Sequence, residues 1–326
     1  MTVFIIRRLM QSALVLIIMS LLVFFGVFAI GDPVEIFVAA DADQAERERA
    51  IKALGLDRPI WAQYGYFVVN ALAGDLGRSF VFNIPSIELI LQRMPATLEL
   101  ASCAVMLSVV IGIPLGMFAG YRPESRISKT IMATSIAGFS LPTFWVGLML
   151  ILVFAVELGW LPSTGRGQLG EFLGIRSSLF TLDGLAHLAL PALNLALFNI
   201  SLVIRLTRAG MRENMPMDYV KFARAKGLSQ KRVVFVHVMK NIMIPVVTVI
   251  GLEIGQVIAF AVVTETIFAW PGMGKLIIDS INNLDRPVIV AYLLITVIMF
   301  IVINLVVDIL YSVLDPRVRL ADAGKS

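Results

Sequence analysis

Glu253 is the ionisable residue with the most unusual setting in this sequence, because it lies in the middle of a long apolar segment with Gln256 close by. A carboxylate in such a segment is costly, and it usually faces a protein interior or a wet cavity. Two interpretations stay open: an ion pair with a neighbouring helix or chain, or a cavity wall that meets a cationic group such as a substrate amine. Asn194 and Asn199 lie inside another apolar segment. They could make interhelical hydrogen bonds or line a polar path.

Motifs for nucleotide hydrolysis and for metal binding are missing from the sequence. Residues 272–275 come nearest to a phosphate-binding loop, but the upstream Gly is absent and Leu276 replaces the hydroxyl residue that would hold magnesium. His187 and His237 are far apart, with no cluster of Cys or acidic residues around them, so two structural histidines are a better interpretation than a metal site. We expect no catalytic residue, no metal and no bound cofactor on this chain.

The composition is that of an integral membrane protein. Of the 326 residues, 58% are hydrophobic and only 15% are charged, and the mean hydropathy is +0.87. A soluble domain has about 25% charged residues. The net charge of +4 is modest, and in a membrane protein such an excess belongs to cytoplasmic loops rather than to nucleic-acid binding. The single cysteine, Cys103, excludes an intrachain disulfide.

Six apolar runs are long enough to cross a bilayer, which takes about 20 residues. They are residues 9–30, 100–120, 131–156, 188–204, 242–264 and 288–307. For the first run a signal peptide is the alternative, but the usual apolar region of such a peptide has only about 7–15 residues. The third run is the longest, and we expect it to cross as one tilted helix. With six spans both termini share one side, and most of the 27 Lys and Arg residues lie there, which predicts that this side is cytoplasmic.

The polar segments between these runs differ in character. Residues 43–54 predict a charged helix that ends at Gly55, and residues 74–80 predict a Gly-punctuated turn. Residues 157–187 read as a polar loop. For the region before the second span, the alternatives are a solvated loop packed on the membrane domain and a docking surface for an external partner.

Residues 218–245 are the most basic stretch of this apolar chain. They predict a short helix capped by Asp218, a stop at Gly227 in the left-handed conformation, and a second helix capped by Ser229. The first helix offers little apolar surface beyond Tyr219, Phe222 and Ala223. We therefore expect it to dock into a groove of a partner rather than to bury a face within this chain.

This stretch resembles the cytoplasmic signature loop of bacterial binding-protein-dependent ABC importer permeases. The general form has a Glu-Ala-Ala triplet, three further residues and a Gly. Here the triplet positions are Lys221, Phe222 and Ala223, so only the second Ala and Gly227 match. The version in the dipeptide/oligopeptide/nickel subfamily reads like DYVxxARAKGLS, and this sequence matches it from Asp218 onward.

Other stretches along the chain resemble the same subfamily, and its first (B-type) permease in particular. They are LGLDRP (54–59), GDLGRS (74–79), PATLELA (95–101), LPTFWVG (141–147), GWLPSTG (159–165), RLTRAGM (205–211), ETIFAWPGMG (265–274) and LDPRVR (314–319). Together and in order they are far more specific than any one of them alone.

The resemblance implies an all-α integral membrane protein with the type I ABC importer permease fold of six transmembrane helices and both termini in the cytoplasm. It implies a multi-pass protein of the bacterial plasma (inner) membrane, a permease subunit of an ATP-driven importer of dipeptides and oligopeptides. Nickel, glutathione or oligosaccharide stay open as substrates, and a stand-alone secondary transporter is the alternative from another class. Residues 1–93 would hold the first span and a long external segment, residues 94–312 the permease core, and residues 313–326 a cytoplasmic tail.

The resemblance also implies the partners. They are a second permease in a heterodimer, two cytoplasmic ATP-binding subunits that hold ATP and magnesium, an external solute-binding protein, the peptide substrate and the lipid bilayer, without nucleic acid. The coupling residues, seated in a groove of an ATPase, would be Tyr219, Lys221, Phe222, Ala223, Arg224, Ala225, Lys226 and Gly227. The candidate residues of the translocation path are Glu253, Gln256, Asn194 and Asn199.

Overall fold

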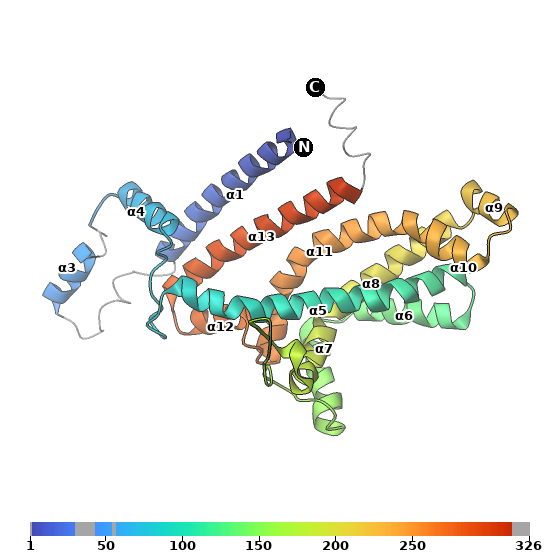
Figure 1. Ribbon diagram of the computed structural model, residues 1–326. Coiled ribbons are helices and arrows are strands. Elements are labelled where there is room, and N and C mark those ends of the chain that lie inside the picture. The colour runs from blue at the N-terminus through green and yellow to red at the C-terminus, as the bar shows by residue number, and fades with distance from the viewer. Residues whose placement is uncertain (1, 30–42, 54–56, 315–326) are drawn as a thin grey trace. The chain divides into compact units, whose positions relative to one another are not determined.

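The computed structural model describes residues 2–29, 43–53 and 57–314, and most of these residues are helical (Figure 1). The chain divides into two compact units. Unit 1 consists of Met1–Arg93 and Leu276–Val302, and unit 2 consists of Met94–Lys275 and Ile303–Ser326.

Unit 1 contains the N-terminal helices and most of the last two. Its elements are α1 (Thr2–Ala29), α3 (Gln44–Ala53), α4 (Ile60–Leu72), the start of α5 (Ser86–Tyr121), most of α12 (Met273–Asn282) and most of α13 (Arg286–Leu314). The predicted charged helix is confirmed as α3, while its expected stop at Gly55 falls outside the described residues. Val23 of α1 packs with Val290 and Leu294 of α13.

A buried carboxylate fixes the predicted turn of unit 1. Asp285 is fully buried and accepts hydrogen bonds from the Ser79 hydroxyl at 2.5 Å and from the Phe80 backbone N–H at 3.1 Å. Gly74 and Gly77 both have a φ of +83°, a conformation that costs little only for Gly. The sequence GDLGRS therefore forms a defined turn.

Unit 2 contains the longest helices. Its elements are the rest of α5, α6 (Arg126–Ser140), α7 (Thr143–Leu150), the π-helix η1 (Ile151–Glu157), β1 (Gly170–Phe172), β2 (Ile175–Ser177), the 3₁₀-helix η2 (Ser178–Phe180), α8 (Leu182–Asn214), α9 (Asp218–Ala225), α10 (Gln230–Arg232), the π-helix η3 (Val233–Val238) and α11 (Met239–Ile267). Helix α8 packs along both α6 and α11 (Figure 1).

The expected polar loop at 157–187 is in fact partly folded. Strand β1 pairs antiparallel with β2. Arg166 makes an ion pair with Glu99 of α5, and Glu99 also accepts the Ser178 backbone N–H at 3.0 Å. A buried charge that is paired and hydrogen-bonded fixes the position of the segment that carries it. A hairpin this short has no periodic apolar signal in the sequence.

Glycines bring α5 and α8 close together. A side chain on Gly116 would place its first carbon 2.7 Å from the Ile204 carbonyl oxygen, and one on Gly112 would lie 2.8 Å from Val203. Gly120 meets Met211 in the same way. Small residues four apart are typical of close helix contacts in membranes, where packing rather than water drives association.

Four described helices are long and apolar enough to cross a membrane, and a bent pair brings the number to as many as five. The expectation of one tilted helix over 131–156 is wrong, because α6 and α7 meet at an angle of 110°. The break falls at Leu141 and Pro142, which are both extended. Proline lacks the N–H needed for the helix, and it disfavours helical geometry in the residue before it.

Candidate functional site

The basic stretch forms the helical hairpin that the sequence predicts. Helix α9 is followed by Gly227 with a φ of +76°, which confirms the left-handed stop. The Ser229 hydroxyl accepts the Arg232 backbone N–H at 3.5 Å, so the second cap is also confirmed. The chain then continues through η3 into α11.

The predicted role of Asp218 as a cap is wrong. The N-cap residue is Met217, which makes no side-chain capping bond, and Asp218 is the first residue of the helix. There its carboxylate pairs with Lys221 one turn later, at 2.9 Å. An acid in the first turn also interacts favourably with the helix dipole.

The expectation that α9 buries no face of its own is also wrong. Val220 is fully buried and Ala223 is 6% exposed. Both pack with Val233 and Val238 of η3 and with Met211 of α8. Val220 and Ala223 are three positions apart, a helical spacing that could have revealed this face in the sequence.

The outward side of α9 carries an aromatic ring and cations. Phe222 is 61% exposed, and the Lys226 ammonium lies 4.5 Å from the centre of its ring. Lys221, Arg224 and Ala225 are exposed as well, whereas the Tyr219 hydroxyl donates to Asn214 of α8 at 2.9 Å. The helix therefore has one face packed on its own chain and one face available to a partner.

A second feature is a cavity of about 240 Å³ in unit 2, whose surface is mostly apolar although five polar residues contribute to its lining. It is lined by Thr143, Leu195, Phe198, Asn199, Glu253, Gln256, Val257, Phe260 and Thr264. Three of the four residues that the sequence singles out for a path thus lie together, on α8 and α11. Thr143 and Thr264 were not predicted, since a Thr inside an apolar run gives no distinctive signal.

Glu253 dominates the electrostatics of this cavity. Among the described residues that line the cavity, Glu253 is charged and the others are neutral. Its Oε2 atom is buried and has no hydrogen-bond partner among the described residues. A carboxylate in this state attracts a cation or a hydrogen-bond donor that enters the cavity.

Asn194 lies behind the cavity rather than in its lining. It is 1% exposed, and its amide donates to the Thr264 hydroxyl of α11 at 3.0 Å. Because Thr264 does line the cavity, Asn194 holds a wall in place through an interhelical hydrogen bond.

The two histidines lie apart. His187 makes a 2.8 Å hydrogen bond to the Asp183 carbonyl one turn earlier in α8. His237 lies in η3. Over the part of the chain that the structure describes, no three His, Cys, Asp or Glu residues are grouped as metal ligands would be.

Comparison with known protein families shows which family the chain belongs to. The family described as "Binding-protein-dependent transport system inner membrane component" matches residues 112–320, and its N-terminal counterpart matches residues 1–101. The chain therefore belongs to the family of binding-protein-dependent transport system inner membrane components. With its apolar helices, it is a multi-pass inner-membrane protein.

Individual relatives cover almost the whole chain. It is 39% identical to the dipeptide transport system permease protein DppB of Escherichia coli (strain K12), over 97% of this chain and 98% of the relative. It is 40% identical to the oligopeptide transport system permease protein AppB of Bacillus subtilis (strain 168), over 98% and 100%. The glutathione transport system permease protein GsiC of Escherichia coli O6:H1 is 38% identical over 97% and 98%.

A solved structure supports the fold alone. The inward-facing MetNI methionine ABC transporter aligns with a TM-score of 0.54 and 16% identity, over 70% of this chain and 96% of that chain.

Proposed function

We propose that this chain is a permease subunit of an ATP-driven ABC importer of dipeptides and oligopeptides. The near full-length similarity to dipeptide and oligopeptide permeases carries the proposal. The similarity to a glutathione permease favours a second candidate, the same machinery with glutathione as its cargo. The chain itself is a non-catalytic membrane subunit, and ATP and magnesium bind to its partner subunits.

The proposed topology has six spans and cytoplasmic termini. Four long helices, the bent pair α6–α7 counted as one span, and α1 with its apolar segment Met10–Gly26 make up the six. The excess of Lys and Arg on the side of the termini supports a cytoplasmic position for that side and for α9.

The proposed assembly contains a second permease, two cytoplasmic ATPases and an external solute-binding protein. Helix α9 sits in a groove of one ATPase and transmits its closure to the spans. Its contact face consists of Lys221, Phe222, Arg224, Ala225 and Lys226. Tyr219 and Ala223 tie the helix to its own chain, and Gly227 sets its end. The burial of α9 against α8 and η3 provides a rigid link to the spans.

The proposed path includes the cavity around Glu253. Its carboxylate receives the amino group of a peptide, while Gln256 and Asn199 offer amides that can hydrogen-bond to a peptide backbone. Asn194 positions Thr264 at the same cavity.

Cysteine crosslinking tests the coupling helix. A cysteine at Phe222 should crosslink to a co-expressed ATPase subunit, whereas one at Val220, which is fully buried in the same helix, should not. Equal crosslinking at both positions, or none at Phe222 with several spacer lengths, would refute the groove.

Substitution of Gly227 gives a functional test. A Cβ there meets no atom within 4 Å, so Gly227→Val strains only the backbone, by about 1–2 kcal/mol or somewhat more for a β-branched residue. For Gly227→Val we expect transport to be lost and ATPase association to weaken, with normal membrane insertion. Asn tolerates the left-handed conformation, so Gly227→Asn should retain much of the transport and of the ATPase association. Normal transport in Gly227→Val would contradict the proposal.

A further inference from the structure

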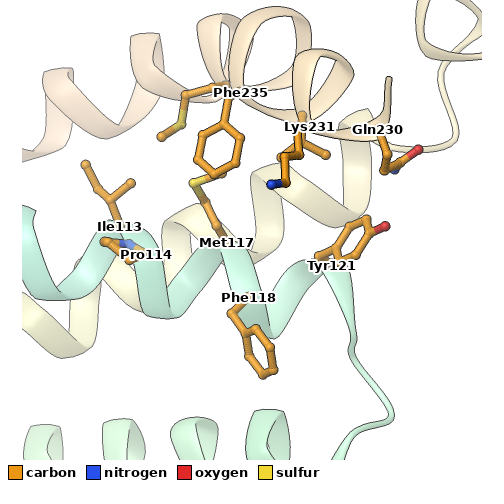
Figure 2. Close-up of a pocket in the computed structure, with 10 residues that line it drawn as sticks. Ile113, Pro114, Met117, Phe118, Tyr121, Gln230, Lys231 and Phe235 are labelled. Carbon is orange, nitrogen blue, oxygen red and sulfur yellow. The ribbon is translucent and has the colours of Figure 1, made fainter. Parts of the chain in front are cut away.

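A second cavity, of about 370 Å³, lies between α5 and the start of the helical segment that leads into α11 (Figure 2). Its volume is within the range of about 300–1,000 Å³ for small-molecule pockets. Its lining includes Ile113, Met117 and Tyr121 of α5, and Lys231, Phe235 and Met239 of the segment that leads into α11. None of these residues belongs to the proposed coupling face or to the cavity around Glu253.

The cavity is almost entirely apolar, and its few polar side chains lie toward one end. Figure 2 shows Tyr121 and Gln230 together at one end, with the Lys231 ammonium between them and the apolar side chains. Ile113 and Pro114 lie at the other end. A ligand that fits this lining has a hydrogen-bonding, charged head and a hydrocarbon body.

The charge at the polar end is positive. Lys231 makes no ion pair among the described residues, and none of the lining residues is acidic. Arg122 follows Tyr121, and Arg232 follows Lys231, so two more cations border this end in the sequence. An anionic head is therefore the complement of this end.

We propose that this cavity binds one anionic phospholipid of the cytoplasmic leaflet, with the phosphate near Lys231 and an acyl chain along Met117, Phe235 and Ile113. The location rests on the proposed topology, which places the 205–240 segment on the cytoplasmic side. Basic pockets at that edge of transmembrane helices attract anionic lipid heads, and each Lys or Arg adds a comparable increment of affinity. The Tyr121 hydroxyl and the Gln230 amide supply neutral donors to the phosphate oxygens.

The backbone beside this cavity departs from a regular α-helix. Lys231 lies in α10, which ends just before η3. In η3 the backbone makes π-helical hydrogen bonds over Val233–Val238. A π-helical turn is wider than an α-helical turn and is frequent at functional sites. Within η3, Val233 and Val238 are buried in the core beneath α9, while Phe235 is 63% exposed on the other side. A bound acyl chain would therefore cover Phe235 without displacing the core that anchors α9.

Native mass spectrometry of the purified full-length complex tests the proposal. With palmitoyl-oleoyl phosphatidylglycerol as the probe, we expect one lipid per chain to survive at detergent levels that strip phosphatidylcholine with the same acyl chains. Lys231→Gln should weaken phosphatidylglycerol binding about fivefold, the factor expected for one basic side chain. Lys240 is an exposed cation that does not line the cavity, so Lys240→Gln should leave phosphatidylglycerol binding unchanged. Equal affinity for the two lipids, or equal effects of the two substitutions, would overturn the proposal.

A photoreactive lipid locates the acyl chain. Phosphatidylglycerol with a diazirine in its tail should label peptides from α5 around Met117 and from η3, and Met239→Trp, which narrows the apolar end, should suppress that labelling. Binding of glycerol phosphate alone would show that the site recognises a free phosphate rather than a lipid. Crosslinking of a Phe235→Cys variant to the second permease would show instead that a protein helix fills the cavity. Either result would overturn the proposal.

Discussion

Helix α11 carries two carboxylates, Glu253 and Glu265, whose surroundings differ in almost every respect. Glu265 is fully buried. It accepts hydrogen bonds from the Thr97 hydroxyl at 2.6 Å and from the Lys275 backbone N–H at 3.0 Å. Thr97 in turn accepts the Met273 backbone N–H at 2.8 Å. Glu265 thus joins α5, the end of α11 and the turn that leads into α12.

Glu253 has no such set of donors. One of its oxygens is buried without a hydrogen-bond partner among the described residues, and its side chain borders an open cavity. Burial of a carboxylate without compensating hydrogen bonds destabilises a protein. The proposed peptide amine would supply the missing partner, and pairing with a neighbouring chain is the alternative.

The comparison separates an acid whose hydrogen bonds are satisfied within the fold from one on the same helix with an unpartnered oxygen at a cavity. Trp270 strengthens the first assignment, because its fully buried indole donates to the Ala96 carbonyl at 2.9 Å beside Glu265. The stretch ETIFAWPGMG therefore has a structural role, because its hydrogen bonds hold the end of α11 against α5. In the cavity around Glu253, by contrast, polar side chains face open space and can hydrogen-bond to a ligand.

The largest expected effect comes from Glu265→Ala. It leaves the Thr97 hydroxyl and the Lys275 N–H buried without their acceptor, so we expect a loss of about 3 kcal/mol in the free energy of unfolding. Denaturation of the purified chain in detergent measures this loss. Glu253→Ala is the matched control on the same helix, and we expect it to cost less than about 1 kcal/mol. Similar losses of stability for the two variants would contradict the structural role assigned to Glu265.

Gly272→Ala should have the next largest effect. The added methyl group would meet the carboxylate of Glu265, so the hydrogen bonds of that carboxylate must shift. We expect a destabilisation of about 1–3 kcal/mol, the usual cost of overpacking. Gly65→Ala, inside α4 with no atom within 4 Å of the new carbon, should be neutral or stabilising by up to about 1 kcal/mol. A neutral Gly272→Ala would show that Glu265 is held less tightly than the distances indicate.

Much of the fold follows from the sequence, because apolar runs and glycine positions are local signals. The runs at 100–120, 188–204, 242–264 and 288–307 all lie within observed helices. The bend between α6 and α7 is marked in the sequence by Pro142 alone, inside an apolar run that is otherwise long enough for one span. The hairpin at 170–177 and its Glu99–Arg166 anchor depend on partners far apart in the chain, which spacing alone cannot reveal.

The sites were predictable to different degrees. Glu253 stands out because an acid inside an apolar run is rare, whereas Thr143 and Thr264 look like ordinary residues of a span. The two faces of α9 are hard to separate in the sequence, because Val220 belongs both to the subfamily motif and to the buried face. Burial in a hairpin depends on the helices packed beneath it, and those helices come from distant parts of the chain.

Glu253→Gln should have the smallest effect on stability and the most informative effect on transport. It removes a charge from a site without a cation among the described lining residues, so the free energy of unfolding should stay within about 0.5 kcal/mol or rise slightly. If the carboxylate meets a peptide amine, uptake of a peptide with a free amino terminus should fall several-fold, while uptake of its N-acetylated form should change little. Comparing the variant with the native chain for each peptide cancels the selectivity of the external binding protein. Asn199→Asp, which adds a second acid to the cavity, should shift the ratio of the two uptake rates in the opposite direction. An unchanged ratio in Glu253→Gln would assign Glu253 to pairing with a neighbouring chain instead.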